Sequence, residues 1–312
     1  MKKLYSFLKF IQHAIELVLF VVIYFFFKLL PFDTASALGG FLFKTIAPHL
    51  KMNKRVRQHL KIAFPEKDAA WRTETLIAFW EQLGRNFGEF PHLPSLKDPK
   101  KFRERVEFKG VDILKEKLNE DRPIICFSGH MANWEVPTYL SYCFGFKTSV
   151  IYKELENKYL DVFLKWGRSH GDYITLLPKG NLSSKGIITA MQEKRILMLL
   201  VDQNAKKGIE TTFFDQIVMS PVAPAKFSLK YDANLFIARL IRKKGAYFCL
   251  EFKPLIVDLS QCKSHLEKER HITNLINRQF EEWIRENPAQ WLWTYRRWGS
   301  YLLESVQDDL TD

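Results

Sequence analysis

The chain of 312 residues is long enough for one large α/β domain or two modest ones, and 47% of its residues are hydrophobic. A formal net charge of +12 favours anionic partners, such as a membrane surface or an acidic protein, whereas no zinc knuckle, RNP-type aromatic motif or recognition-helix pattern supports a nucleic-acid partner. The four cysteines form no C-x-x-C pair, so we expect free thiols in a reducing compartment and no metal site.

Residues 1–32 are expected to form a membrane anchor or an interfacial helix. The run Leu17–Phe27 is apolar throughout, but a bilayer span needs roughly 17–25 such residues, so the uncharged core is short. A single span, a helix lying along the bilayer and a signal peptide are therefore the alternatives. Residues 35–37, Ala-Ser-Ala, resemble a cleavage site, but Lys28 and Pro31 interrupt the path to it. This pattern favours an anchor or an interfacial helix over cleavage.

Residues 33–100 are expected to form a helical lead-in that faces the membrane. Apolar residues recur at helical spacing over three segments, which are Thr34–Ile46, Met52–Phe64 and Trp71–Phe87. More lysines and arginines follow the first apolar run than precede it. The positive-inside rule then predicts that the rest of the chain lies on the cytoplasmic side.

Residues 101–312 have the pattern of an α/β catalytic region. Short apolar runs typical of strands alternate with amphipathic segments typical of helices. The expected strands are Val106–Gly110, Pro123–Ser128, Phe146–Tyr152, Ile174–Leu177, Ile196–Val201, Leu235–Ile241 and Tyr247–Val257. The expected helices are Val111–Leu118, Trp134–Phe144, Glu156–His170 (ending near Gly171), a helix that Ser183 or Ser184 caps and that continues to Glu193, Pro224–Asp232 and His265–Glu286.

A histidine follows one of the apolar, strand-like runs of this region. The strand Pro123–Ser128 leads through Gly129 into His130, so His130 stands at the end of a strand, where open α/β sheets bind their ligands. A continuous helix would keep His130 and Glu135 about 140° apart, but a turn before the helix would bring them together. We therefore expect Glu135 to hold the imidazole of His130 in one tautomer while His130 accepts a proton.

Two interpretations of this pair remain open. No G-x-S-x-G elbow surrounds Ser128, so the functional interpretation is a base that activates a substrate hydroxyl without an acyl-enzyme. In the plainer interpretation, His130 is a turn residue and Glu135 only favours the start of the following helix by its charge.

Later polar residues extend the candidate site. Arg168 can clamp a phosphate with its guanidinium, although a solvated helix charge is the plainer interpretation. Asp202 and Gln203 end a strand at the same sheet edge as His130, which predicts a shared cleft. Asp202 can orient His130, bind a sugar hydroxyl, position Arg168 or serve as a simple turn residue. The expected substrate-binding residues are Asn133, Arg168, Lys179, Asp202, Gln203 and Arg239.

The segment 129–135, Gly-His-Met-Ala-Asn-Trp-Glu, resembles the HxxxxE box of the late lipid A acyltransferases of the lauroyl/myristoyl type. The wider superfamily of glycerolipid acyltransferases carries HxxxxD instead. Arg168 is similar to an arginine that follows the box in this family.

Two later segments resemble the same family. Phe213-Phe214 with residues 220–224, Ser-Pro-Val-Ala-Pro, is similar to the block FFG…TPxAPA that closes the acyl pocket, although Asp215 replaces the usual glycine. Residues 288–298 resemble the C-terminal block PxQWxWxxRRW. The resemblance therefore covers most of the chain.

This resemblance implies a mixed α/β sheet of the glycerolipid acyltransferase type, flanked by helices. It implies transfer of a fatty acyl chain from acyl carrier protein to a hydroxyl of a phosphorylated lipid A precursor. The site would lie on the cytoplasmic face of the inner membrane, and no cofactor or metal would be required. The alternatives are another lipid acceptor, an acyl thioesterase in which His130 activates water, and a catalytically silent membrane-binding protein.

Overall fold

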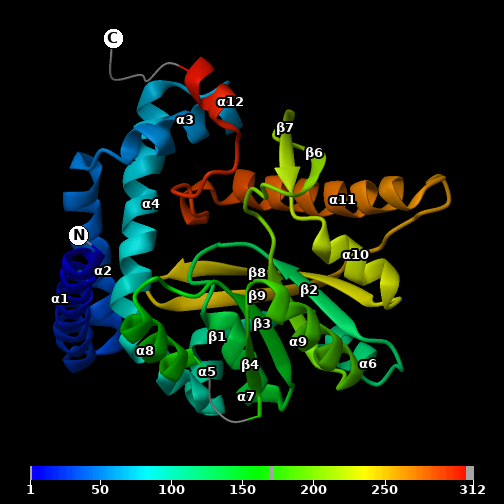
Figure 1. The fold of residues 1–312 in the computed structure, drawn as a ribbon, viewed down its shortest axis with the longest axis horizontal. Coiled ribbons are helices and arrows are strands. Elements are labelled where there is room, and N and C mark those ends of the chain that lie inside the picture. The colour runs from blue at the N-terminus through cyan, green and yellow to red at the C-terminus, as the bar shows by residue number, and fades with distance from the viewer. Residues whose placement is uncertain (1, 169–171, 307–312) are drawn as a thin grey trace.

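The computed structural model describes residues 2–168 and 172–306. A seven-stranded sheet forms the centre of the protein, in the order β1-β9-β8-β2-β5-β3-β4 (Figure 1). Five neighbouring strands from β8 to β4 run parallel, β9 is antiparallel to β8, and β1 is parallel to β9. The strands are β1 (Val106–Lys109), β2 (Ile124–Ser128), β3 (Thr148–Tyr152), β4 (Ile174–Pro178), β5 (Ile196–Leu200), β8 (Asn234–Lys244) and β9 (Tyr247–Pro254).

Helices cover both faces of this sheet because successive strand residues point to opposite sides. One face packs against α5 (Pro99–Arg105), α6 (Val111–Leu118), α7 (Leu140–Phe144) and the 3₁₀ helices η2 (Phe90–Lys97) and η3 (Val136–Tyr139). The opposite face packs against α9 (Asn181–Gln192), α10 (Ala223–Lys230) and α11 (His265–Glu286). The strands between these layers read as apolar runs because they are buried on both sides, as in β2.

The helices between α1 and η2 pack onto the sheet and its covering helices. They are α2 (Phe32–Ile46), the 3₁₀ turn η1 (Ala47–His49), α3 (Asn53–Ala63) and α4 (Ala69–Glu89). Apolar residues of α3 and α4 share a core with α11 and with the tryptophans of the C-terminal segment. Backbones of α2 and α4 come very close, since a Cβ built on Gly39 would lie 2.3 Å from the carbonyl oxygen of Gly84. Glycine is therefore required at this crossing.

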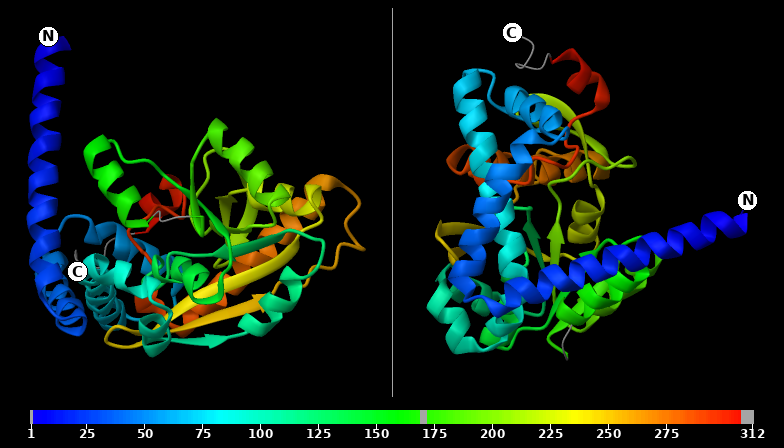
Figure 2. Two further views of the ribbon diagram at one scale, coloured as in Figure 1. Left: turned by 90° about the horizontal axis from the view of Figure 1, so that it is seen from below. Right: turned by 90° about the vertical axis from the view of Figure 1, so that its left-hand side faces the viewer.

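The first helix, α1 (Lys2–Leu29), lies at the edge of the molecule, and its amino-terminal end projects past the body (Figure 2). Its segment Tyr5–Leu29 is long and apolar enough to cross a membrane by length and composition. The carboxyl-terminal end of α1 is fixed to η2: Lys28 Nζ donates to the Pro91 carbonyl (2.9 Å), and His92 Nε2 donates to the Phe27 carbonyl (2.9 Å).

The expected mixed α/β fold with an apolar N-terminal helix is confirmed, and α6 and α11 begin and end where the sequence predicted. The helix expected over Trp134–Phe144 is wrong in its first part, because Trp134 and Glu135 lie in a turn and the short 3₁₀ helix η3 begins only at Val136. Sequence patterns also did not predict the hairpin β6 (Ile209–Phe213) and β7 (Gln216–Ser220). The expected helix over Glu156–His170 is α8 (Lys158–Arg168), and its expected end near Gly171 lies outside the described residues.

A buried histidine gives this packing a pH dependence. His59 on α3 is fully buried, and its Nδ1 donates to the Trp293 carbonyl (2.8 Å). Burial lowers the pKa of His59 from its ordinary 6.5 to about 4, and the charges of Arg55 and Arg296 act in the same direction. The folded state therefore holds His59 neutral, whereas the unfolded chain protonates it below pH 6.5.

We expect the free energy of unfolding to fall by about 2 kcal/mol between pH 7 and pH 5 through this residue, because the folded pKa lies below the unfolded one. His59→Asn, whose amide nitrogen can replace Nδ1 but does not titrate, should remove that part of the pH dependence. Urea unfolding at the two pH values would measure it, with the exposed His265→Asn as the control. An unchanged pH dependence in His59→Asn would contradict the assignment.

Candidate active site

His130 and Asp202 meet because their strands are parallel neighbours. Ser128 of β2 pairs with Leu200 of β5, and the histidine and the aspartate each follow two residues later. His130 Nδ1 lies 2.8 Å from Asp202 Oδ1, and the His130 backbone N–H donates to Oδ2 (2.8 Å). Gly129 allows this approach, since a Cβ there would lie 3.2 Å from Oδ2.

Asp202 is held as a carboxylate inside the protein. Its side chain is 3% exposed, and burial alone would raise its pKa. The positive charge that His130 can carry, the two bonds from His130 and one from Trp291 Nε1 (2.8 Å) outweigh burial and keep the pKa of Asp202 below its usual range. A carboxylate accepts hydrogen bonds, so Nδ1 of His130 carries its proton.

The other ring nitrogen of His130 faces the site. Gln203 Nε2 lies 3.2 Å from His130 Nε2 and donates to its lone pair. The rings of Trp134 and Tyr295 flank the imidazole, with centroids 5.3 and 5.4 Å from it. In the neutral histidine, Nε2 is thus the acceptor, which is the form that a general base requires.

The expected pairing of Glu135 with His130 is corrected by this geometry. Both ring nitrogens of His130 are engaged by Asp202 and Gln203. Glu135 instead accepts two bonds from Arg168 of α8, from Nε (2.9 Å) and from one terminal nitrogen (2.5 Å). The reason is the turn, which carries Glu135 toward α8 and leaves His130 at the end of β2, beside Asp202. Of the roles considered for Asp202, the structure supports orientation of His130.

The Glu135–Arg168 pair forms one wall of a small pocket. The remaining lining is mostly aromatic and apolar, and comes from α1, η2, η3 and α8: Tyr24, Phe90, Leu93, Pro94, Tyr139 and Phe163. Arg168 keeps 29% of its side chain exposed. A charged pair at one wall of an apolar pocket can orient an amphipathic ligand.

The C-terminal segment holds the turn in place. Ala132 has a φ of 48°, in the left-handed region, and its N–H donates to the Gln290 carbonyl (2.8 Å). The Leu292 N–H donates to the His130 carbonyl (3.0 Å), and Met131 and Trp291 form an isolated antiparallel bridge. Residues more than 150 positions away therefore fix the conformation that presents His130.

A buried ion pair supports the same turn from the other side. Glu89 of α4 is fully buried and is bound by the guanidinium of Arg242 on β8. Glu89 also accepts from Asn133 Nδ2 (2.7 Å), and Asn86 Nδ2 donates to the Ala132 carbonyl (2.6 Å). The candidate ligand Asn133 thus points into the protein. Sequence reasoning did not single out Glu89. The available signal was Arg242, because an arginine within the apolar strand β8 indicates a buried acidic partner.

Two expected binding residues lie elsewhere. Arg239 is buried on β8 and is ion-paired with Glu251 (2.8 Å) and Glu286, so the expectation that Arg239 binds substrate is corrected. Lys179 is exposed just after β4, at the same sheet edge as His130. With β5 and β3 between β2 and β4, the spacing of strands puts it roughly 14 Å along that edge.

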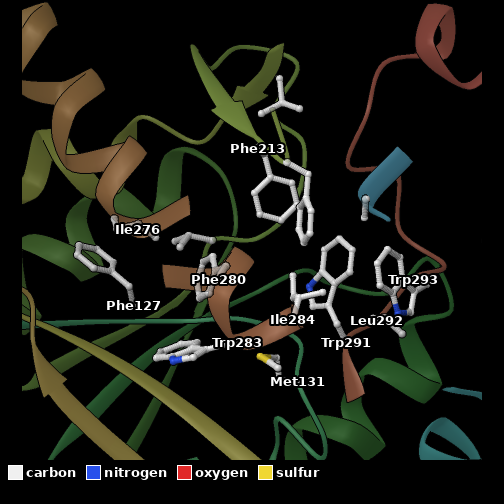
Figure 3. Close-up of a cluster of buried hydrophobic side chains, with 14 of the residues drawn as sticks. Phe127, Met131, Phe213, Ile276, Phe280, Trp283, Ile284, Trp291, Leu292 and Trp293 are labelled. Atoms are coloured by element: carbon white, nitrogen blue, oxygen red, sulfur yellow. The ribbon is translucent and has the colours of Figure 1, made fainter. Parts of the chain in front are cut away.

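The Phe213-Phe214 pair packs into the core beside the site. Phe213 lies against Trp291, with ring centroids 5.9 Å apart (Figure 3). The Trp298 ring also contacts Phe213, with a centroid distance of 5.6 Å. Phe214 and Asp215 form the β6–β7 turn, with φ of 49° and 57°. Aspartate tolerates this left-handed conformation better than most residues, so Asp215 fits a turn position that favours glycine.

The fold and this geometry define an α/β enzyme whose polar site lies at the carboxyl ends of parallel strands. Residues 3–300 match the family described as bacterial lipid A biosynthesis acyltransferase, and the chain belongs to this family. The protein is therefore an acyltransferase that acts on lipids. The solved 1-acyl-sn-glycerophosphate (LPA) acyltransferase PlsC from Thermotoga maritima aligns at 12% identity over 84% of this chain and 100% of that chain, with a TM-score of 0.34. No curated protein matched the chain.

Replacing Asp202 by asparagine should lower kcat by about 10²–10⁴, because the amide does not fix the Nδ1–H tautomer or stabilise an imidazolium. Glu135→Gln serves as the comparison, since Glu135 bonds Arg168 and not His130. Steady-state rates of acyl transfer would be measured together with circular dichroism. A larger loss in Glu135→Gln than in Asp202→Asn, with both proteins folded, would contradict the assignment of Asp202.

Breaking the Glu89–Arg242 pair from one side should destabilise the protein by about 3–5 kcal/mol, because a buried charge is left alone. Glu89→Met is the single change, and Glu89→Met combined with Arg242→Met should cost less than the single change. Urea unfolding measures both. A double variant less stable than Glu89→Met would show that the two charges do not compensate each other.

Proposed function

We propose that this enzyme transfers a fatty acyl chain from acyl carrier protein to a hydroxyl of a lipid A precursor, with His130 as the general base. The observation that carries the proposal is the contact between His130 Nδ1 and Asp202, which leaves Nε2 directed to the site. Membership of the lipid A acyltransferase family supports the choice of acceptor class.

In the proposed reaction, the acceptor hydroxyl replaces the Gln203 amide as the partner of His130 Nε2. Nε2 takes the hydroxyl proton while the oxygen attacks the thioester carbonyl. Asp202 stabilises the imidazolium that forms. When the tetrahedral intermediate collapses, the carbon–sulfur bond breaks, and the leaving thiolate takes the proton back from Nε2. The products are an ester and the free thiol of the carrier, and no acyl-enzyme forms.

The oxyanion of that intermediate needs donors that are not already engaged. The N–H groups of His130, Met131 and Ala132 are bonded to Asp202, Gly129 and Gln290, so these turn amides are poor candidates. The Gln203 amide and the guanidinium of Arg168 carry N–H groups that can donate to an oxyanion, and we propose them for this role. Removal of water by the acyl chain would protect the thioester from hydrolysis.

The Glu135–Arg168 pair is proposed to receive the polar part of a substrate. Glu135 holds the planar guanidinium in one orientation, and a phosphate of the acceptor would meet its exposed edge. The proposed role of Glu135 is therefore to position Arg168, in place of the expected role on His130.

The proposed location is the cytoplasmic face of the inner membrane, with α1 as the membrane-binding element. The apolar segment Tyr5–Leu29 supports membrane association, and the excess of lysine and arginine after it supports the cytoplasmic side. A net charge of +12 suits both an acidic carrier protein and a phosphorylated lipid.

The test is acyl transfer in vitro, with acyl carrier proteins of several chain lengths, a tetra-acylated lipid A precursor, and mass spectrometry of the products. We expect the lipid to gain the mass of one acyl chain. The rate of this transfer should fall about 10²–10⁴-fold in His130→Ala and stay unchanged in His265→Ala, which removes an exposed histidine. Free fatty acid without a lipid product, still dependent on His130, would favour a thioesterase. Transfer to a lysophospholipid but not to the lipid A precursor would replace the proposed acceptor.

A further inference from the structure

An apolar stripe on α8 is exposed next to the membrane-binding helix. Tyr159 and Val162 lie three residues apart on α8, and Leu155 lies just ahead of it. Their exposed fractions are 50%, 65% and 42%. The Leu155 N–H donates to Asp161 (3.0 Å), which holds Leu155 against the helix. We call these three residues the α8 stripe.

The helix that carries the stripe is docked along α1. Asn157 Nδ2 donates to the His13 carbonyl (2.9 Å) and to Glu16 (3.0 Å). Six residues later, the Phe163 ring meets Phe20 and Tyr24, with centroids 5.5 and 5.0 Å away. The two helices therefore run side by side in the same direction, as both views of Figure 2 show.

This register places α8 beside the apolar segment of α1. Asn157 donates a hydrogen bond to the carboxylate of Glu16, one of the few charges within that segment, and Asn157 is itself buried. α1 continues past Asn157 toward its amino terminus, and many of its apolar side chains are exposed, among them Tyr5, Leu8, Ile11, Ile15 and Leu19. A surface that receives these side chains also meets the adjacent end of α8.

Local charges favour a bilayer over an acidic protein as the partner of the stripe. The exposed side chains around it are two lysines, Lys153 and Lys158, and two glutamates, Glu154 and Glu156. Lys165 is already bonded to Asp161 (2.8 Å) and Glu154 (3.3 Å). Because these charges balance, the stripe has no net electrostatic attraction for an acidic carrier protein. Moving its apolar surface from water into lipid, by contrast, lowers the free energy.

We propose that α8 is a second lipid-contacting element, and that its stripe enters the membrane surface beside α1. This inference rests on the membrane association proposed for α1. It connects the bilayer to the site, because α8 ends at Arg168, which bonds Glu135. The distance from Asn157 to Arg168 along the helix is about 16 Å, so the Glu135–Arg168 pair lies within reach of a lipid headgroup that sits at the same surface.

The test uses the fluorescent label NBD, attached to one introduced cysteine at a time in the full chain. Cys143 and Cys262 become serine, and the buried Cys126 and Cys249 remain. The label is placed at Val162 on α8, at Leu19 on α1, and at Ile256, which is 88% exposed in the loop after β9. Neutral phosphatidylcholine vesicles that contain a nitroxide-labelled lipid quench a label that enters the bilayer, and acyl-transfer activity is not needed for this readout.

We expect quenching at positions 162 and 19 but not at 256. Quenching at 19 alone would overturn the lipid contact of α8 and leave the membrane association of α1 intact. Quenching at none of the three would overturn both. As an unlabelled check, Val162→Asp should lower the vesicle partition coefficient about tenfold, whereas the matched change Ile256→Asp should leave it unchanged. Equal partitioning of the two variants would count against the stripe.

Discussion

The bond between Asp202 and His130 organises the site, because one carboxylate fixes both the backbone and the ring of the histidine. Asp202 binds the His130 N–H and Nδ1 and also the indole of Trp291. It can do so because β2 and β5 are parallel neighbours, with Ser128 paired to Leu200. His130 and Asp202 each follow two residues later and therefore come into contact. A shift of one residue in that pairing would turn the aspartate to the other face of the sheet.

The turn that carries His130 is held by segments from across the chain. The lead-in helix α4 binds it through Asn86 and Glu89, and the C-terminal segment binds it through Gln290 and Leu292. Buried charges and a left-handed alanine are costly on their own, so they persist only where the surroundings compensate for them. Helix α4, which precedes the sheet in the chain, therefore completes the support of the site.

Periodicity predicted the elements well where a segment is apolar and long. It identified the seven strands of the central sheet and the helices α6 and α11, and the shared edge of two strands predicted that Asp202 and Gln203 would join His130. Periodicity failed where tertiary contacts determine which side chains meet. The choice of Asp202 over Glu135 as the partner of His130 depends on which strands are neighbours. The ion pairs of Arg239 with Glu286 and of Arg242 with Glu89 likewise depend on glutamates far away in sequence. The β6–β7 hairpin turns on Phe214 and Asp215, which lack the glycine signal of such turns.

The contact between the turn and residues 290–292 also sets an order of events during synthesis. A chain emerges from the ribosome amino terminus first, so α1 and both strands of the site are made before Gln290, Trp291 and Leu292. Until then, the Ala132 N–H, the His130 carbonyl and the Asp202 carboxylate each lack a partner that the finished protein supplies. The turn that presents His130 therefore reaches its final conformation only after residues 290–292 have been made, and a chain that stops before them lacks a fully formed site.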